Sequence, residues 1–442
     1  MAKKPKGFDP KQKKDLEAHA TKLISAFVAG VVQVDDPNAL VFGEYGGGIF
    51  EGLIVHFSKE YFEATQAFTL LAVSMLHSKH AHEKTIRSMC QKAGQQFVEH
   101  QFEKPDPTAQ DLKNASEQLV AQVLAEAGKE YIHICPNHLL RLPDSSTLVL
   151  GRVSCMPTAQ ATATTKLASI AKIHLMENAE TVMDFAEGKC FVGMPSTVWV
   201  VEVAATKANV MEEARWLIDV AVSLARLSTA KWSGLFPGKG DTEPSATTAA
   251  QSQLPQVTLD GANALTGAVA PLRRYELSID VLNDLGHATV QAVASKIFDP
   301  PPKSLAESVA QGLGWMTRAR CATDRAEKLL HFFTAMEALL SSDDKTAPVV
   351  QNICRHASVI YSQIPKDRAI VFAQIKNLYA RRSSLIHAGR REVLEGDVAL
   401  IQIYVESIYF IVLNNCDLKM NKNTFIATLS QASHGLPWSL HS

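Results

Sequence analysis

The chain lacks several features that would place it outside the ordinary globular class. It contains no run of about eighteen apolar residues, the length of a membrane-spanning helix. Its seven cysteines are scattered without a Cys-x-x-Cys pair, which excludes a disulfide scaffold and favours reduced thiols. Lys and Arg number 44 against 45 Asp and Glu, so a generally basic surface is excluded. We expect a cytoplasmic protein in which any contact with nucleic acid comes from a local patch.

Familiar motifs of catalytic sites are also missing. No Gly-x-Ser-x-Gly or His-Glu-x-x-His sequence occurs. The glycine-rich residues 234–240 resemble a phosphate loop only superficially, because they end in Gly where Ser or Thr is required. A helix would not place His77, His80 and His82 on one face, so we predict a solvated polar surface there rather than a zinc site. We therefore expect no cofactor and no bound metal.

Composition divides the chain into three parts. Residues 231–261 are enriched in Gly, Pro, Ser, Thr and Gln, which is typical of a loop or a domain linker. The sequence before them mixes helical and strand patterns, and the sequence after the three prolines at 300–302 is helical throughout. We predict an α+β protein with an N-terminal mixed α/β region (1–230), a linker with one further strand (231–302) and a C-terminal all-helical bundle (303–442).

Periodicity predicts the individual elements. Helices are expected at residues 15–32, 61–97, 110–127, 209–227, 304–322, 324–340, 347–363, 367–388 and 396–415. Strands are expected at residues 49–57, 197–204 and 273–281, with a hairpin formed by residues 131–141 and 147–154.

The most informative stretch runs from residue 377 to residue 389. Read as a helix, it has an apolar face through Leu378, Leu385 and Ile386, and Arg382 points into that face. Gly389 marks the expected end of the helix. An arginine among leucines requires a partner, because an unpaired buried charge is strongly destabilising.

Glu337 is the candidate partner of Arg382. It falls inside the apolar face that Phe333 and Leu340 define on the predicted helix 324–340. Two helices that each carry one opposite charge on the apolar side predict a mutual ion pair. The pattern alone leaves open whether this pair only fixes the helix register or belongs to a functional site.

The segment Arg382-Ser383-x3-His387 resembles the Arg-x4-His motif of the HEPN ribonucleases, and its context is similar to the Apea-like branch. Ser383 stands where many HEPN motifs have Asn, Asp or His. The similarity covers residues 304–418 and rests on three segments in order, namely 318–325, 333–340 and 378–389.

This resemblance implies a metal-independent endoribonuclease. The 2′-hydroxyl of RNA would attack the adjacent phosphorus, with His387 as general acid or base and Arg382 stabilising the phosphorane. Ser383 would orient the imidazole or donate to a phosphate oxygen, and Glu337 and Tyr379 would support the site. The expected products are a 2′,3′-cyclic phosphate and a 5′-hydroxyl.

The resemblance also implies partners. HEPN bundles usually pair, so we expect a homodimer through the C-terminal bundle, acting in antiviral defence of bacteria by abortive infection. The N-terminal region would sense a phage or cellular trigger. Lys376, Arg381, Arg390 and Arg391 flank the site and are either a solvated helix end near the C-terminal dipole or a binding surface for RNA phosphates.

Two other interpretations stay open. The bundle could be a non-catalytic HEPN module that binds a nucleotide or a partner protein. It could also be a structural adaptor in which Glu337 and Arg382 form a register device. Trp199 and Trp216 are predicted to lie in the core rather than to stack on bases.

Overall fold

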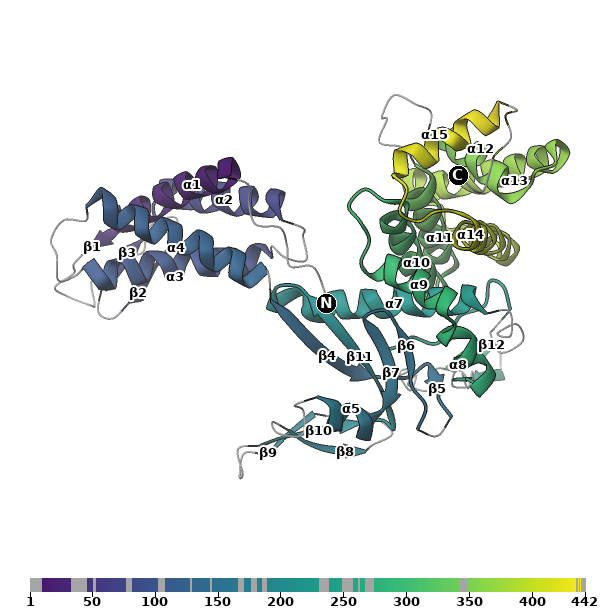
Figure 1. The fold of residues 1–442 in the computed structure, drawn as a ribbon, viewed down its shortest axis with the longest axis horizontal. Coiled ribbons are helices and arrows are strands. Elements are labelled where there is room, and N and C mark those ends of the chain that lie inside the picture. Colours follow the sequence, from purple (N-terminus) through teal and green to yellow (C-terminus); the bar gives the residue numbers. More distant parts are fainter. Residues whose placement is uncertain are drawn as a thin grey trace. The chain divides into compact units, whose positions relative to one another are not determined.

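A computed structural model gives the fold as two compact units (Figure 1). Unit 1 comprises Met1–Ile132 and Glu202–Glu213, and unit 2 comprises His133–Val201 and Ala214–Ser442. These limits do not coincide with the sequence-based division after residues 230 and 302. The structure describes residues 10–32, 46–50, 53–76, 82–101, 108–127, 129–143, 145–165, 171–175, 181–184, 189–229, 238–248, 257–260, 263–266, 274–341, 349–434, 436 and 438.

Unit 1 is built around four helices that pack on one another (Figure 1). They are α1 (Pro10–Ala29), α2 (Lys59–Met75), α3 (Glu83–Gln101) and α4 (Ala109–Ala127). A small antiparallel sheet has the order β1-β3-β2, formed by β1 (Val31–Val32), β2 (Gly47–Phe50) and β3 (Leu53–His56).

The core of unit 1 follows from helical spacing. Leu16, Leu23 and Phe27 recur along one face of α1 and are fully buried. Phe27 meets the edge of the Tyr61 ring of α2 at a centroid distance of 5.4 Å. The predicted helices 15–32 and 110–127 are confirmed apart from their ends. The single helix 61–97 is wrong because α2 ends at Met75, and the single strand 49–57 is wrong because β2 and β3 form a hairpin there.

Four strands form the larger sheet, in the order β4-β11-β7-β6 (Figure 1). They are β4 (Glu130–Pro136), β6 (Leu148–Leu150), β7 (Val153–Pro157) and β11 (Thr197–Ala204). The predicted strand 197–204 is confirmed. The predicted hairpin is wrong: β6 pairs with β7, whereas β4 lies beside β11, which is distant in sequence.

Shorter strands complete the sheets. β5 (Leu140–Arg141) pairs in parallel with β14 (Tyr275–Glu276), so among the described residues 274–281 of the predicted strand 273–281 only two form a strand. The remaining ladders are the sheet β8-β10-β9 and the hairpin of β12 with β13, formed by β8 (Ala171–Leu175), β9 (Thr181–Asp184), β10 (Lys189–Met194), β12 (Val257–Asp260) and β13 (Asn263–Thr266). The short helix α5 (Thr158–Thr164) follows β7 directly.

The C-terminal part of unit 2 is helical (Figure 1). Its helices are α8 (Ile279–Gly286), α9 (Ala288–Phe298), α10 (Leu305–Cys321), α11 (Arg325–Leu340), α12 (Val349–Tyr361), α13 (Pro365–Ala388), α14 (Glu395–Asn415) and α15 (Lys422–Ser433). The 3-10 turn η3 (Lys207–Asn209) and helix α7 (Val210–Ser228) precede them in the chain. The α+β class and the helices α7 and α10 to α14 are confirmed, whereas α8, α9 and α15 were not predicted.

Helix α14 is apolar on most of its surface. By length and composition it could cross a membrane, but 56% of its apolar window is buried inside the bundle. It also carries Gln402 and Glu406, which are 2% and 6% exposed and hydrogen-bonded within the protein. These are the properties of a core helix.

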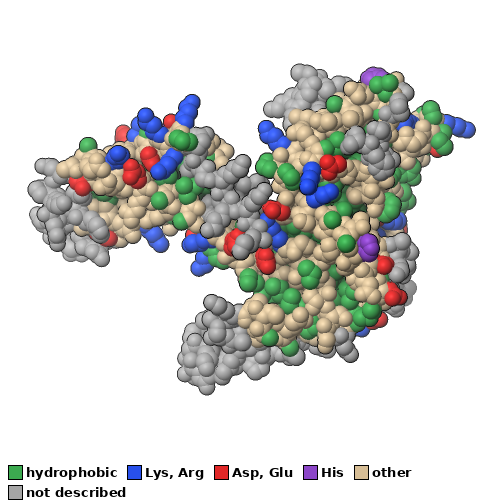
Figure 2. Space-filling model, in the orientation of Figure 1, with side chains coloured by type: hydrophobic (Ala, Val, Ile, Leu, Met, Phe, Trp, Pro, Cys, Tyr) green, Lys and Arg blue, Asp and Glu red, His purple; other side chains and the backbone are tan. Residues whose placement is uncertain are grey.

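Charges are interspersed on the molecular surface. Figure 2 shows acidic and basic side chains side by side over the face in view, in keeping with the formal net charge of −1. A nucleic-acid contact would therefore depend on a few local cations.

Candidate functional site

Helix α13 carries the residues that the sequence singled out. It begins with proline at Pro365 and ends at Gly389, whose φ of 63° is left-handed and whose N–H donates to Leu385 O at 3.1 Å. The predicted helix end is therefore confirmed. The predicted apolar face is only partly correct, because Leu378 is buried while Ile386 is 47% exposed. Full burial along α13 ends at Tyr379; residues 381–385 are half-buried, and the helix is exposed from Ile386 onward.

Arg382 and Glu337 form the predicted ion pair. Arg382 Nη2 lies 3.2 Å from Oε1 of Glu337 and 3.3 Å from Oε2. The Tyr379 hydroxyl donates to the same Oε1 at 2.9 Å, and the Arg382 guanidinium lies 5.1 Å from the centroid of the Tyr379 ring. Burial together with the neighbouring Glu337 carboxylate raises the pKa of Tyr379 to about 12, so its hydroxyl remains a donor.

One donor of this arginine is unused. Arg382 Nε is buried and has no hydrogen-bond partner among the described residues. The guanidinium is thus held from one side by Glu337 while its side chain remains 21% exposed. Such a group is fixed in place but retains hydrogen-bonding capacity.

His387 lies in the last turn of α13 and is exposed. Within the described part of the chain it has no hydrogen bond or ion pair, and the half-buried Ser383 does not bond to it. His387 lies five positions after Arg382, which is about 140° around a helix. The two side chains of one protomer therefore leave the helix in different directions.

Two of the four predicted RNA-binding cations contact carboxylates. Arg381 Nη1 lies 3.0 Å from Oδ2 of Asp397 in the first turn of α14. Arg391 pairs with Asp324, whose carboxylate also caps α11 by accepting from two backbone N–H groups. Lys376 and Arg390 are exposed. The role of all four in binding RNA remains a prediction.

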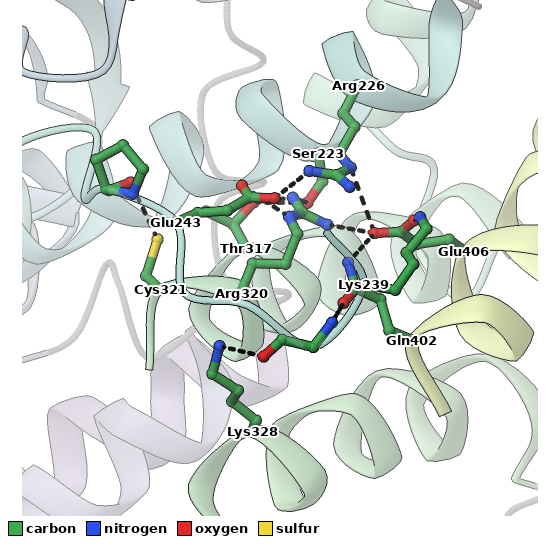
Figure 3. Close-up of polar contacts among 12 residues, drawn as sticks. Ser223, Arg226, Lys239, Glu243, Thr317, Arg320, Cys321, Lys328, Gln402 and Glu406 are labelled. Carbon is green, nitrogen blue, oxygen red and sulfur yellow. Dashed lines mark hydrogen bonds and ion pairs between the residues drawn. The ribbon is translucent and has the colours of Figure 1, made fainter. Parts of the chain in front are cut away.

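A buried charge cluster that was not predicted lies elsewhere in unit 2 (Figure 3). Its centre is Arg320 of α10, whose side chain is 0% exposed. Arg320 lies 3.2 Å from Oε2 of Glu243 and 3.4 Å from Oε1 of Glu406, and it donates to the Ser223 and Thr317 hydroxyls at 2.7 and 3.0 Å.

Further cations surround the same two carboxylates. Arg226 of α7 pairs with Glu243 and lies 3.3 Å from Glu406, and Lys239 also pairs with Glu406 (Figure 3). Burial by itself would raise the pKa of Glu406, but Arg226 and Arg320 lower it below the usual value. The Glu406 carboxylate is therefore held in its charged form by guanidinium groups.

A signal for this cluster exists in the sequence. Arg320 and Glu406 lie on apolar helices, just as Arg382 and Glu337 do, and the same reasoning could have paired them. Glu243 gave no such signal because residues 238–248 have neither helical nor strand periodicity. Trp199 is buried in the core as predicted, while Trp216 packs against Trp315 at a centroid distance of 5.7 Å and is half-buried.

Within the described part of the chain, no group of three or more His, Cys, Asp and Glu side chains is placed to hold a metal ion, and His77 and His80 lie outside it. Comparison with protein-family models, with curated proteins and with solved structures finds no match to this chain. The HEPN resemblance remains a prediction.

Proposed function

We propose that the chain is a metal-independent endoribonuclease of the HEPN type. The observation that carries this proposal is the arrangement on α13. Arg382 is fixed by Glu337 and Tyr379 at the edge of the bundle, and His387 on the same helix is exposed and has no partner among the described residues. A fixed cation and an available imidazole are the groups that metal-free RNA cleavage needs.

Each residue has a role in this mechanism. The RNA 2′-hydroxyl attacks the adjacent phosphorus, and His387 exchanges a proton with the attacking or leaving oxygen. Arg382 donates to the non-bridging oxygens of the phosphorane, where its permanent charge is most useful. Glu337 and Tyr379 are positioning residues, because they hold the guanidinium and do not contact RNA. Ser383 orients the imidazole or donates to a phosphate oxygen.

The site is completed by a second copy of the chain. Because Arg382 and His387 of one helix diverge by about 140°, a shared cleft needs the arginine of one protomer and the histidine of the other. Exposed apolar side chains on the bundle support such a dimer: Ile403 and Phe410 of α14 are 37% and 51% exposed, and Ile386 of α13 is 47% exposed.

Surface cations would guide the RNA strand to this cleft. The Arg391–Asp324 pair is exposed, with side-chain accessibilities of 72% and 39%, so its loss costs little. An RNA phosphate can therefore replace Asp324 as the partner of Arg391. Arg381, Arg390 and Lys376 complete the local positive patch.

The biological setting rests on the family resemblance alone. We propose that cleavage halts translation in a phage-infected cell, with the N-terminal region sensing the trigger. The alternative function is a non-catalytic HEPN module that binds a nucleotide or a partner protein.

Incubation of pure protein with total RNA in the presence of a chelator tests the proposal. The wild type should produce fragments ending in a 2′,3′-cyclic phosphate, while His387→Ala and Arg382→Ala should produce none. His434→Ala removes another exposed histidine of the bundle and is the matched control that should cut normally. Cleavage retained by His387→Ala contradicts the mechanism, and binding without cleavage by the wild type indicates the alternative.

A further inference from the structure

Residues 238–248, here called the strap, are docked into unit 2. The sequence predicted a loop or domain linker for this region, and these residues are indeed irregular, but the prediction did not include their burial against helices. The strap has an irregular backbone, yet Glu243, Pro244 and Ala246 are buried. Several of its polar groups form hydrogen bonds or ion pairs with helices that are distant in sequence (Figure 3).

The first half of the strap is bonded to three helices of the bundle. Gly240 N–H donates to Gln402 Oε1 of α14 at 2.8 Å, and Lys328 Nζ of α11 donates to Gly240 O at 3.0 Å. Glu243 N–H donates to Arg320 O of α10 at 2.9 Å. The strap therefore connects α10, α11 and α14 at one place (Figure 3).

The second half is bonded to the segments of the larger sheet. Ala246 O accepts two hydrogen bonds of 3.0 Å, one from the indole N–H of Trp199 on β11 and one from the backbone N–H of His138. Trp199 is 1% exposed, so this contact lies in the core. A few residues thus attach the bundle at one end and the sheet at the other.

Ion pairs connect the strap to the surrounding helices. Glu243 supplies one of the two carboxylates that balance Arg226, Arg320 and Lys239, and its side chain is 3% exposed. Without the strap, Glu406 alone would face both buried guanidiniums. An incomplete buried charge cluster is strongly unfavourable, so docking is all-or-none rather than gradual.

Contacts continue from the strap towards α13. Gln402 and Glu406 lie on α14, and Asp397 in the first turn of the same helix pairs with Arg381. Arg381 is the neighbour of Arg382. Helix α14 is thus a rigid element shared by the strap and by the helix that carries the candidate site.

We propose that the strap is a charge-held latch, a single cooperative unit that couples the sheet to α14 and, through Asp397, to the end of α13. Release of the strap therefore destabilises its contacts with the sheet and its contacts with α14 together. The coupling itself is independent of the nuclease assignment, whereas its effect on RNA cleavage rests on that proposed function.

Amide hydrogen exchange of the full-length protein tests the latch. The readouts are the amides of Gly240, Glu243 and His138, with the Leu394 amide, which donates to Asp397 at 3.1 Å, reporting on α14. Replacing Glu243 by Gln keeps the shape and removes the charge, and should accelerate exchange of all four amides by about tenfold or more. Glu276→Gln is the matched control, because the Glu276 side chain is 71% exposed. It should leave the exchange rates of the four amides unchanged.

If Glu243→Gln does not fold, a second variant that removes only one ion pair of the strap provides the test. Lys239 is 41% exposed and contributes one ion pair, so Lys239→Ala should fold and should accelerate the same amides to a smaller degree. Faster exchange at Gly240 and Glu243 with no change at His138 or Leu394 would overturn the coupling. Unchanged exchange in both variants would overturn the role of charge. RNA cleavage by the variants is measured as a separate experiment. If His387→Ala still cleaves RNA, the nuclease proposal fails, but the hydrogen-exchange result for the latch is unaffected.

Discussion

Glu337 on α11 accepts a hydrogen bond from Arg382 on α13 with Oε2 at 3.3 Å, and the same guanidinium nitrogen forms an ion pair with Oε1 at 3.2 Å. The two side chains are 24% and 21% exposed. The pair is thus neither freely solvated nor fully buried. Its energetic role and its proposed catalytic role can be separated by mutation.

A double-mutant cycle measures the energetic role. Arg382→Met and Glu337→Leu should each destabilise the protein, because each leaves a charge without its partner. The double variant should recover most of the loss, with a coupling energy of about 1.5 kcal/mol in urea unfolding. RNA cleavage should be absent in the double variant although it is folded. Full activity of that variant would reduce the pair to a register device.

Tyr379→Phe separates the hydroxyl from the ring. The ring meets Phe333 edge-on at 5.2 Å and would remain in place, while the 2.9 Å hydrogen bond to Glu337 would be lost. We expect a loss of about 1 kcal/mol in the free energy of unfolding. Cleavage should fall without disappearing, since Arg382 still pairs with Glu337. An unchanged rate and stability would show that this hydroxyl does not position the carboxylate.

Gly312 of α10 is required for close packing. A Cβ atom there would lie 1.5 Å from the Tyr409 hydroxyl, which is buried and donates to Ala335 O at 2.7 Å. Gly312→Ala should therefore cost about 3 kcal/mol or more in thermal or urea unfolding. Gly396→Ala on α14 meets nothing within 4 Å and should be neutral or slightly stabilising. Equal stability of the two variants would contradict the packing.

Stability should fall at mildly acidic pH because of His356. This side chain is 3% exposed, its ring nitrogens contact Leu340 O and Ser430 Oγ, and burial lowers its pKa below the usual value. The unfolded chain then binds the proton first, so the free energy of unfolding falls as the pH drops below about 6.5. His356→Gln should show a shallower decrease between neutral and acid pH than the wild type. Identical slopes would remove His356 from the acid response.

Phe410→Glu tests the proposed dimer. Phe410 is 51% exposed on α14, so a charge there should not disturb the core but should oppose association of two apolar faces. The wild type should sediment as a dimer and the variant as a monomer with an unchanged melting temperature. Val149→Glu, on a residue that is 45% exposed and lies on β6, is the control that should remain dimeric.

Local periodicity predicted the helices well and their partners less well. Helical spacing located α10 to α14, and a charge among apolar residues on two of these helices was enough to pair Glu337 with Arg382. The exposure of Ile386 was not predicted, because apolar spacing does not show where a helix extends beyond the helices packed against it. Residues 76–82 contain no Pro or Gly, so the end of α2 gave no signal.

The local sequence pattern could not predict which distant segments contact one another. The alternation in β4 predicts a strand but does not say that its neighbour is β11 rather than the next strand in the chain. The composition of the strap correctly indicated an irregular backbone. It could not indicate burial, because Glu243 becomes an interior residue only when Arg226 and Arg320 surround it.

The parallel pairing of β5 with β14 has a consequence for biosynthesis. Leu140 aligns with Tyr275, and the ion pair beside it joins Arg141 to Glu276 across 135 positions. A growing polypeptide leaving the ribosome therefore carries β5 without its neighbour until much of unit 2 has been translated. Pairing of strands so distant in sequence is slow, and the edge of β5 stays unpaired until β14 is available. The pairing of β5 with β14 is accordingly a late step of folding during synthesis.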